Sequence, residues 1–271
     1  MKPLSLKFAA ALVLGAALAS AAGRGDYVFY YTPEYLRFRK RIVDEFKKTP
    51  AGRFSEFAHR SRADKGAEHK VIALTFDACT GKPGGYNKEL IDYLREERIP
   101  ATLFVTGVWI DRNKETFAEL SKDPLFEIEN HGLLHRLCST SGRTMYGVRS
   151  TMDLSGVIDE MELNARKIQQ LTGRRPVFFR SATAYTDDLS RKVAERLGME
   201  VVSYDVLSGD AMKDDAAKIS RNILSGARHG AVVIMHFNHP EWPEVAALKL
   251  AVPELRKRGF NFGRLDRFTL R

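Results

Sequence analysis

The sequence predicts an α/β fold in which seven parallel strands form a barrel or a strongly curled sheet. From Val71 onward, short apolar runs of β type alternate with segments whose apolar residues recur at the helical period. Three of these runs also end in an acid or a histidine, namely Asp77, His131 and His236. Functional groups of parallel α/β folds gather at the carboxyl ends of strands, so this coincidence favours the same architecture.

The individual strands and helices follow from these runs in chain order. In the first helical segment Leu90, Ile91 and Leu94 share one face, and Gly173 provides the stop signal of a longer one. The predicted strands are residues 71–76, 101–106, 126–130, 177–181, 201–206, 231–237 and 261–265. The predicted helices between them are residues 87–97, 153–171, 189–197, 216–224 and 245–258.

The first 69 residues are predicted to lie outside this sheet. Residues 1–22 have the pattern of a secretory signal peptide. Lys2 and Lys7 precede an uncharged stretch, residues 8–19, that is too short to span a bilayer comfortably. An uncleaved N-terminal anchor is the alternative. Residues 23–69 are predicted to form a helical extension and a polar linker, and residues 70–271 are predicted to form the main domain. We therefore expect a secreted or periplasmic protein that is not inserted in a membrane after signal cleavage.

Composition narrows the class of partner. The chain has 271 residues, of which 44% are hydrophobic, enough for the core of one large domain. Its formal net charge is +9, and loss of residues 1–22 removes two lysines and no acid, which leaves +7. This balance suits an anionic partner, but charges of both signs alternate along the helices and no basic block is interleaved with aromatic residues. Nucleic-acid binding is therefore disfavoured, and the oligomeric state is not predicted.

The chain has two cysteines, each shortly after a candidate site residue. Cys79 follows Asp77, and Cys138 follows His135. In an oxidising compartment, a disulfide between these two loops is expected to clamp them together. The alternatives are a thiolate that binds a metal, or two unpaired apolar residues.

His131 and His135 are candidate metal ligands. Neutral imidazoles suit zinc, cobalt or nickel, and a spacing of one turn directs both rings toward one ion. The alternative is that the two histidines merely share the surface of a helix.

The other strand ends carry candidate acid–base groups. Burial would raise the pKa of Asp77 unless a cation lies nearby, and Arg180 is the candidate, either in a structural salt bridge or as the partner of a general base. His236 ends a strongly apolar run and is placed to donate a proton, with Asp210 to hold its ring. Its alternative role is a hydrogen bond to the backbone.

From about residue 70 to residue 268 the chain resembles the polysaccharide deacetylases of the NodB-like group, also called carbohydrate esterase family 4. The stretches that carry the resemblance are Leu74-Thr-Phe-Asp-Ala-Cys79, residues 99–107, Glu127-Ile-Glu-Asn-His-Gly-Leu-Leu-His135, Arg175-Pro-Val-Phe-Phe-Arg180, residues 204–210 and Ile234-Met-His236. The resemblance implies a deformed seven-stranded (β/α) barrel and a divalent metal, usually Zn²⁺, that activates an acetyl carbonyl and water.

By position, the resemblance implies a role for each candidate residue. Asp77 corresponds to the catalytic base and Arg180 to the arginine that tunes it. His131 and His135 correspond to metal ligands. The catalytic acid corresponds to His236, and its partner to Asp210.

One departure concerns the metal. The family's third ligand, an aspartate, is replaced by Ala78, which cannot bind a metal. Glu129 is a candidate substitute because it lies two residues before His131, on the same face of a strand, and Asp77 is the other candidate.

The sequence as a whole predicts a secreted, metal-dependent hydrolase of carbon–nitrogen bonds other than peptide bonds. It would remove N-acetyl or O-acetyl groups from an acetylated polysaccharide such as peptidoglycan or another cell-wall or extracellular glycan. Two alternatives remain open: a non-catalytic glycan-binding homologue, favoured by Ala78, and a metal-independent hydrolase of a small non-peptide amide.

Overall fold

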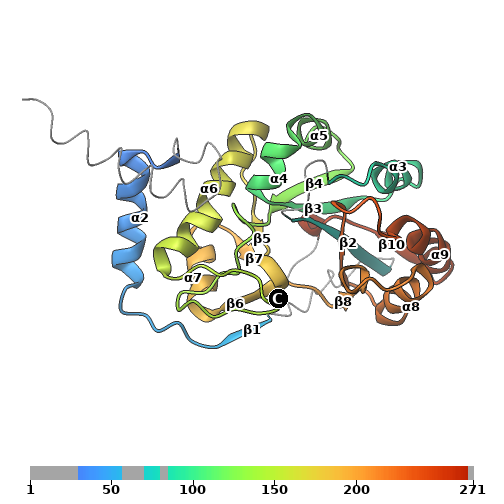
Figure 1. Cartoon of the computed structure of the whole chain (residues 1–271). Helices are drawn as coiled ribbons and strands as arrows, with labels where there is room; N and C mark the ends of the chain where they lie inside the picture. The colour runs from blue at the N-terminus through green and yellow to red at the C-terminus, as the bar shows by residue number, and fades with distance from the viewer. Residues whose placement is uncertain (1–29, 57–69, 80–84, 268–271) are drawn as a thin grey trace, which may run out of the picture. The chain divides into compact units, whose positions relative to one another are not determined.

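The computed structural model describes residues 30–56, 70–79 and 85–267 (Figure 1). The predicted signal peptide and most of the predicted linker lie outside these residues. The chain divides into two compact units, residues 1–49 and 50–271. In the first unit, α2 (Pro33–Phe46) is the predicted N-terminal helix: Pro33 occupies its first turn, and the Thr32 side chain accepts a hydrogen bond from the Tyr35 N–H at 3.1 Å.

The second unit is built on a parallel sheet. Its strands are β2 (Lys70–Ala78), β3 (Ala101–Val105), β4 (Phe126–Asn130), β5 (Phe178–Phe179), β7 (Glu200–Val201), β8 (Val206–Leu207) and β9 (Val232–His236). They follow the order β7-β5-β4-β3-β2-β9-β8, and β10 (Phe260–Phe262) pairs with the start of β2. The predicted parallel α/β architecture is confirmed.

The sheet must curl, because its two edge strands are joined by a short link. Residues 202–205 connect β7 to β8, and an extended chain crosses at most about 18 Å over that interval. Seven strands laid flat would span about 29 Å, so only a curled sheet brings the edges within reach. The single strand predicted for residues 201–206 is therefore wrong: it is two short strands on opposite edges.

Alternation along β2 separates two cores. Ile72, Leu74, Phe76 and Ala78 point toward the helices and join the main hydrophobic core, whereas Ala73 joins a small apolar cluster inside the curl. Asp77, two residues from Thr75 and four from Ala73, therefore faces the interior. Burial on both faces explains why the strands read as continuous apolar runs.

Helices cover the outer face of the sheet (Figure 1). The predicted helices are present as α3 (Lys88–Glu96), α6 (Leu154–Thr172), α7 (Asp188–Arg196), α8 (Ala216–Gly226) and α9 (Glu244–Lys257). The structure adds α4 (Gly107–Arg112) and α5 (Lys114–Leu120), which are too short for a clear period, and an antiparallel pair, β1 (Phe54–Glu56) with β6 (Tyr185–Asp187). Within the described residues, no helix combines the length and apolarity needed to cross a membrane.

Candidate functional site

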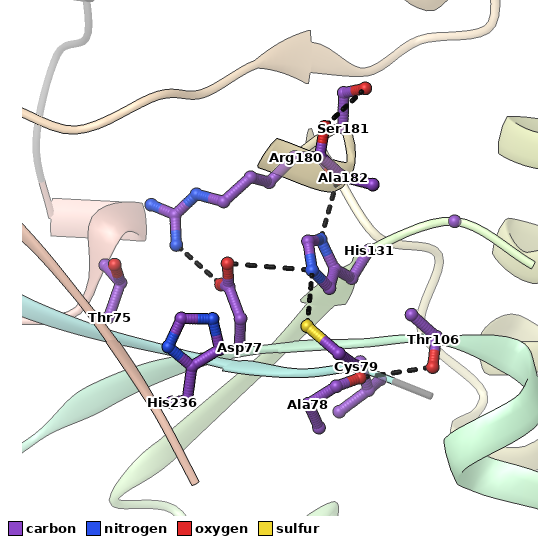
Figure 2. A network of polar contacts seen from close by, with 12 residues as sticks. Thr75, Asp77, Ala78, Cys79, Thr106, His131, Arg180, Ser181, Ala182 and His236 are labelled. Atoms are coloured by element: carbon purple, nitrogen blue, oxygen red, sulfur yellow. Dashed lines mark hydrogen bonds and ion pairs between the residues drawn. The ribbon is translucent and has the colours of Figure 1, made fainter. Parts of the chain in front are cut away.

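Strand register brings the predicted site residues together at one edge of the sheet. We call this edge, formed by the carboxyl ends of β2, β4, β5 and β9, the rim. Asp77 on β2 and His236 on β9 are direct partners across neighbouring parallel strands. Asn130 on β4 pairs with Phe179 on β5, so the residues that follow them, His131 and Arg180, also leave the sheet side by side. The side chains of Asp77, His131, Arg180 and His236 converge in Figure 2.

The Asp77 carboxylate lies between a cation and an imidazole. Arg180, whose side chain is fully buried, donates from Nη1 to Asp77 Oδ1 at 2.7 Å. Its Nη2 donates to the Ser203 carbonyl at 2.9 Å, and its guanidinium stacks 4.1 Å from the centre of the Phe104 ring. Asp77 Oδ2 is 3.6 Å from His131 Nε2. Three contacts thus fix Arg180, which in turn orients the carboxylate.

His131 is oriented as a metal ligand would be. Its Nδ1 is 2.9 Å from the Arg180 carbonyl oxygen, which can only accept a hydrogen bond, so the proton sits on Nδ1. In the neutral ring Nε2 keeps a lone pair directed at the rim, where it meets Asp77 and, at 3.5 Å, the Cys79 sulfur. A hydrogen bond from the distal ring nitrogen to a carbonyl is the usual way to set a ligating histidine.

His135 reaches the same place from a loop rather than a helix. Gly132 and His135 both have positive φ, 87° and 57°. The buried Glu160 carboxylate of α6 accepts hydrogen bonds from the Leu134 and Arg136 N–H groups at 3.0 and 2.8 Å. A Cβ on residue 132 would lie 2.4 Å from a Glu160 oxygen, which explains the glycine. The two imidazole centres are 5.0 Å apart, so this braced loop, and not a helical turn, brings the rings together.

His236 is held from behind by Asp210, which begins a short 3₁₀ turn after β8. Asp210 Oδ2 accepts from the His236 backbone N–H at 2.6 Å and lies 3.1 Å from its Nδ1. Asp210 Oδ1 is fixed by Ser208 and by the Ala211 N–H. Burial alone would lower the pKa of His236, but Asp210 and Cys79 raise it well above 6.5. The ring is therefore placed to hold a proton on Nε2.

The predicted disulfide is wrong, because both cysteines are free. Cys138 is fully buried. Its backbone forms an isolated β-bridge with Thr186, and its backbone N–H donates a hydrogen bond to Ser181 Oγ. The Cys79 sulfur instead faces the histidines (Figure 2). Burial opposes ionisation of this thiol, but the positive charges of the His135 and His131 rings, when these are protonated, hold its pKa well below 9.0.

Cys79, His131 and His135 together form a group that can hold a metal ion. One donor atom from each lies within 4.8 Å of the others. A thiolate and two imidazoles are the donors that zinc and cobalt accept. The residues present therefore fit a divalent metal, and this group contains neither of the acids predicted from the sequence.

Glu129, the first predicted substitute for the missing carboxylate, is not part of this group. It lies on the interior face of β4 as alternation required, but its Oε2 accepts from the Val177 and Phe178 N–H groups at 2.9 and 2.7 Å. These amides mark the beginning of β5, away from the rim. Burial raises the pKa of Glu129 well above 4.5, which suits a role inside the curl. Asp77, the second candidate, accepts from Arg180 through Oδ1, and its Oδ2 lies 3.6 Å from His131 Nε2, but it is not part of the group of Cys79 and the two histidines.

A signal for Cys79 was present in the sequence. Residues two apart on a strand share a face, so a strand that directs Asp77 inward directs Cys79 inward as well. The buried Glu244 at the start of α9 was not among the predicted residues. A lone acid after a proline carries no such signal.

Comparison with known proteins yields one family. Residues 64–202 match the family model described as polysaccharide deacetylase. A peptidoglycan-N-acetylglucosamine deacetylase of Bacillus cereus is 29% identical over 196 residues, which cover 71% of this chain and 85% of that protein.

Three solved structures, two of them of the same protein, share the fold. A family 4 acetyl xylan esterase of Clostridium thermocellum in complex with cobalt is 24% identical, with a TM-score of 0.59 over 73% of this chain and 89% of that one. A pseudoenzyme of carbohydrate esterase family 4 from Bacillus anthracis is 19% identical, with a TM-score of 0.61 over 73% and 65% of the two chains. A mutant of that pseudoenzyme described as having restored activity gives 0.62 at 21% identity, over 73% and 67%.

Proposed function

Because the chain belongs to the polysaccharide deacetylase family, we propose that it is a metal-dependent hydrolase that removes acetyl groups from an N-acetylated glycan. The observation that carries the proposal is the rim itself. A buried carboxylate held by Arg180, two inward imidazoles, and a third imidazole held by Asp210 meet at the ends of neighbouring strands. We further propose that the protein is secreted or periplasmic, on the pattern of residues 1–22.

Each side chain has a place in amide hydrolysis. Asp77 accepts the proton of the attacking water as its oxygen bonds to the acetyl carbon, and Arg180 keeps the carboxylate directed at that water. A divalent metal, with Zn²⁺ as our choice, would supply Lewis acidity toward the carbonyl oxygen and would be held by His131 and His135. His236 then donates a proton to the glycan nitrogen as the carbon–nitrogen bond breaks. The products are acetate and a free amine.

The substrate class rests on the relatives. The Bacillus cereus relative is named for N-acetylglucosamine in peptidoglycan, and a second relative, from Bacillus subtilis, for N-acetylmuramic acid in the same polymer. Peptidoglycan is therefore the first polymer to test. An O-acetylated xylan is the second, because the acetyl xylan esterase shares this fold.

A non-catalytic glycan-binding role is the second candidate. The absence of a carboxylate at Ala78 and the likeness to a pseudoenzyme of known structure favour it. Binding alone, however, requires neither a buried carboxylate–guanidinium pair nor a histidine fixed by an aspartate.

Acetate release from acetylated polymers, with and without a chelator, tests the proposal. We expect release from peptidoglycan that stops when the metal is removed and when Asp77 is replaced in Asp77→Asn. Asp92→Asn is the matched control, because Asp92 lies half-exposed on α3, away from the rim. Binding of the polymer without release by the metal-loaded wild type would support the glycan-binding role instead.

A further inference from the structure

Cys79 occupies the position from which a third ligand would complete the two-histidine site. Its sulfur is 3.5 Å from His131 Nε2, on the side of that ring opposite the hydrogen bond to Arg180. Figure 2 shows the sulfur and the imidazole facing each other, with Ala78 turned away from both.

The spacing is that of two ligands on one tetrahedral ion. With a zinc–sulfur bond of about 2.3 Å and a zinc–nitrogen bond of about 2.05 Å at a tetrahedral angle, sulfur and nitrogen lie about 3.6 Å apart. The observed 3.5 Å agrees with that value, and His135 completes a group whose donor atoms all lie within 4.8 Å.

Residue 78 cannot take this place in the present backbone. Its side chain is fully buried in the core between sheet and helices, and its carbonyl accepts a hydrogen bond from Thr106 Oγ1 at 3.1 Å. Strand alternation assigns the interior to residues 77 and 79, so a ligand that follows Asp77 must come from position 79.

We propose that the Cys79 thiolate is the third protein ligand of the metal, which gives a site of two imidazoles and one thiolate in place of two imidazoles and one carboxylate. The assignment rests on the proposed function only in that both require a metal at this rim. A thiolate selects zinc or cobalt over the magnesium, calcium and manganese that prefer oxygen ligands. Three protein ligands leave the fourth position open, as in catalytic zinc sites.

Cobalt titration of the full chain tests the assignment. We expect one Co²⁺ per chain, with a sulfur-to-cobalt charge-transfer band in the near ultraviolet. In Cys79→Ser the band should vanish and the dissociation constant should rise by more than about 100-fold, beyond the effect of losing an outer-shell partner. Cys138→Ser is the matched control, because Cys138 is also free but lies fully buried outside the metal-binding group. It should keep both the band and the affinity.

A second measurement does not depend on the folding of a variant. Bound zinc should protect Cys79 of the wild type from iodoacetamide, as mapped by mass spectrometry. Cobalt binding without the band, equal affinity in Cys79→Ser, no binding at all, or alkylation of Cys79 at the same rate with and without zinc would each overturn the assignment.

Acetate release measured on the same samples separates the two proposals. A charge-transfer band without acetate release would support the thiolate ligand and contradict the proposed deacetylase activity. Acetate release without the band would support the activity and contradict the thiolate ligand.

Discussion

Glu244 begins α9 with a carboxylate that is fully buried, and neither of its oxygens has a hydrogen-bond partner from another residue in the described part of the chain. Burial raises the pKa of Glu244 to about 8, and the charge of Asp210 adds to this. The N-terminus of a helix favours a carboxylate, but only by about 1 kcal/mol, so desolvation decides the direction. We predict that ionisation of Glu244 makes the fold less stable as the pH rises.

The magnitude follows from linkage. The folded chain binds this proton more tightly than the unfolded chain, whose glutamate has a pKa of 4.5, so stability falls as the pH rises from 4.5 to about 8. Each pH unit in that window costs about 1.4 kcal/mol, and the whole window at most about 5 kcal/mol. At 2–4 °C per kcal/mol for a domain of this size, the melting temperature would change by about 10–20 °C at the upper limit.

Glu244→Gln removes the titration and keeps the shape of the neutral acid. Urea unfolding of wild type and variant between pH 5 and pH 9 should give similar stabilities at pH 5 and a growing advantage for the variant up to pH 8. Glu115→Gln is the control, since Glu115 is exposed on α5 and should leave the pH profile unchanged. Profiles of wild type and Glu244→Gln that run parallel across the whole range would refute the reasoning.

Two further predictions concern the rim. Arg180→Met leaves the Asp77 carboxylate buried without its partner, so we expect a loss of about 3–5 kcal/mol in urea unfolding, much of it recovered in the double variant with Asp77→Asn; a loss below about 1 kcal/mol would contradict the geometry. Asp210→Asn removes the negative charge beside the His236 ring, so we expect kcat to fall by at least about 100-fold while metal content, measured by elemental analysis, stays constant; loss of the metal together with activity would show that Asp210 acts through the metal site instead.

The apolar runs were sufficient to predict most of the sheet and the convergence of the site. The strand 126–130 has the predicted bounds, and Asp77 and His236 meet because parallel strands end at one edge. The run 201–206 could not be resolved, since a period of two looks the same in one strand as in two short ones. The run is divided because β7 pairs with β5 at one edge of the sheet and β8 pairs with β9 at the other. These pairings depend on partners far away in the chain, which local periodicity does not report.

The ligand set shows the same limit at the scale of a side chain. Alternation alone placed Glu129 with His131 and, applied to β2, would place Cys79 with Asp77. It predicts a shared face but not the direction of a long side chain. The backbone N–H groups of Val177 and Phe178 bind the Glu129 carboxylate. The short side chain of Cys79, in contrast, remains at the end of its strand beside the His131 imidazole.

The buried pair of Asp77 and Arg180 bears on the choice between catalysis and binding. Taking two charges out of water costs several kcal/mol per ion, and apolar residues of similar volume often serve a fold equally well. Arg180 is fully buried, and its Nε has no hydrogen-bond partner among the described residues, so the pair is not optimised for stability. Its cost is understandable if a carboxylate must be held in one orientation at a rim where it takes a proton from water. A protein that only binds a glycan would gain nothing from that charge, which is why we favour catalysis despite Ala78.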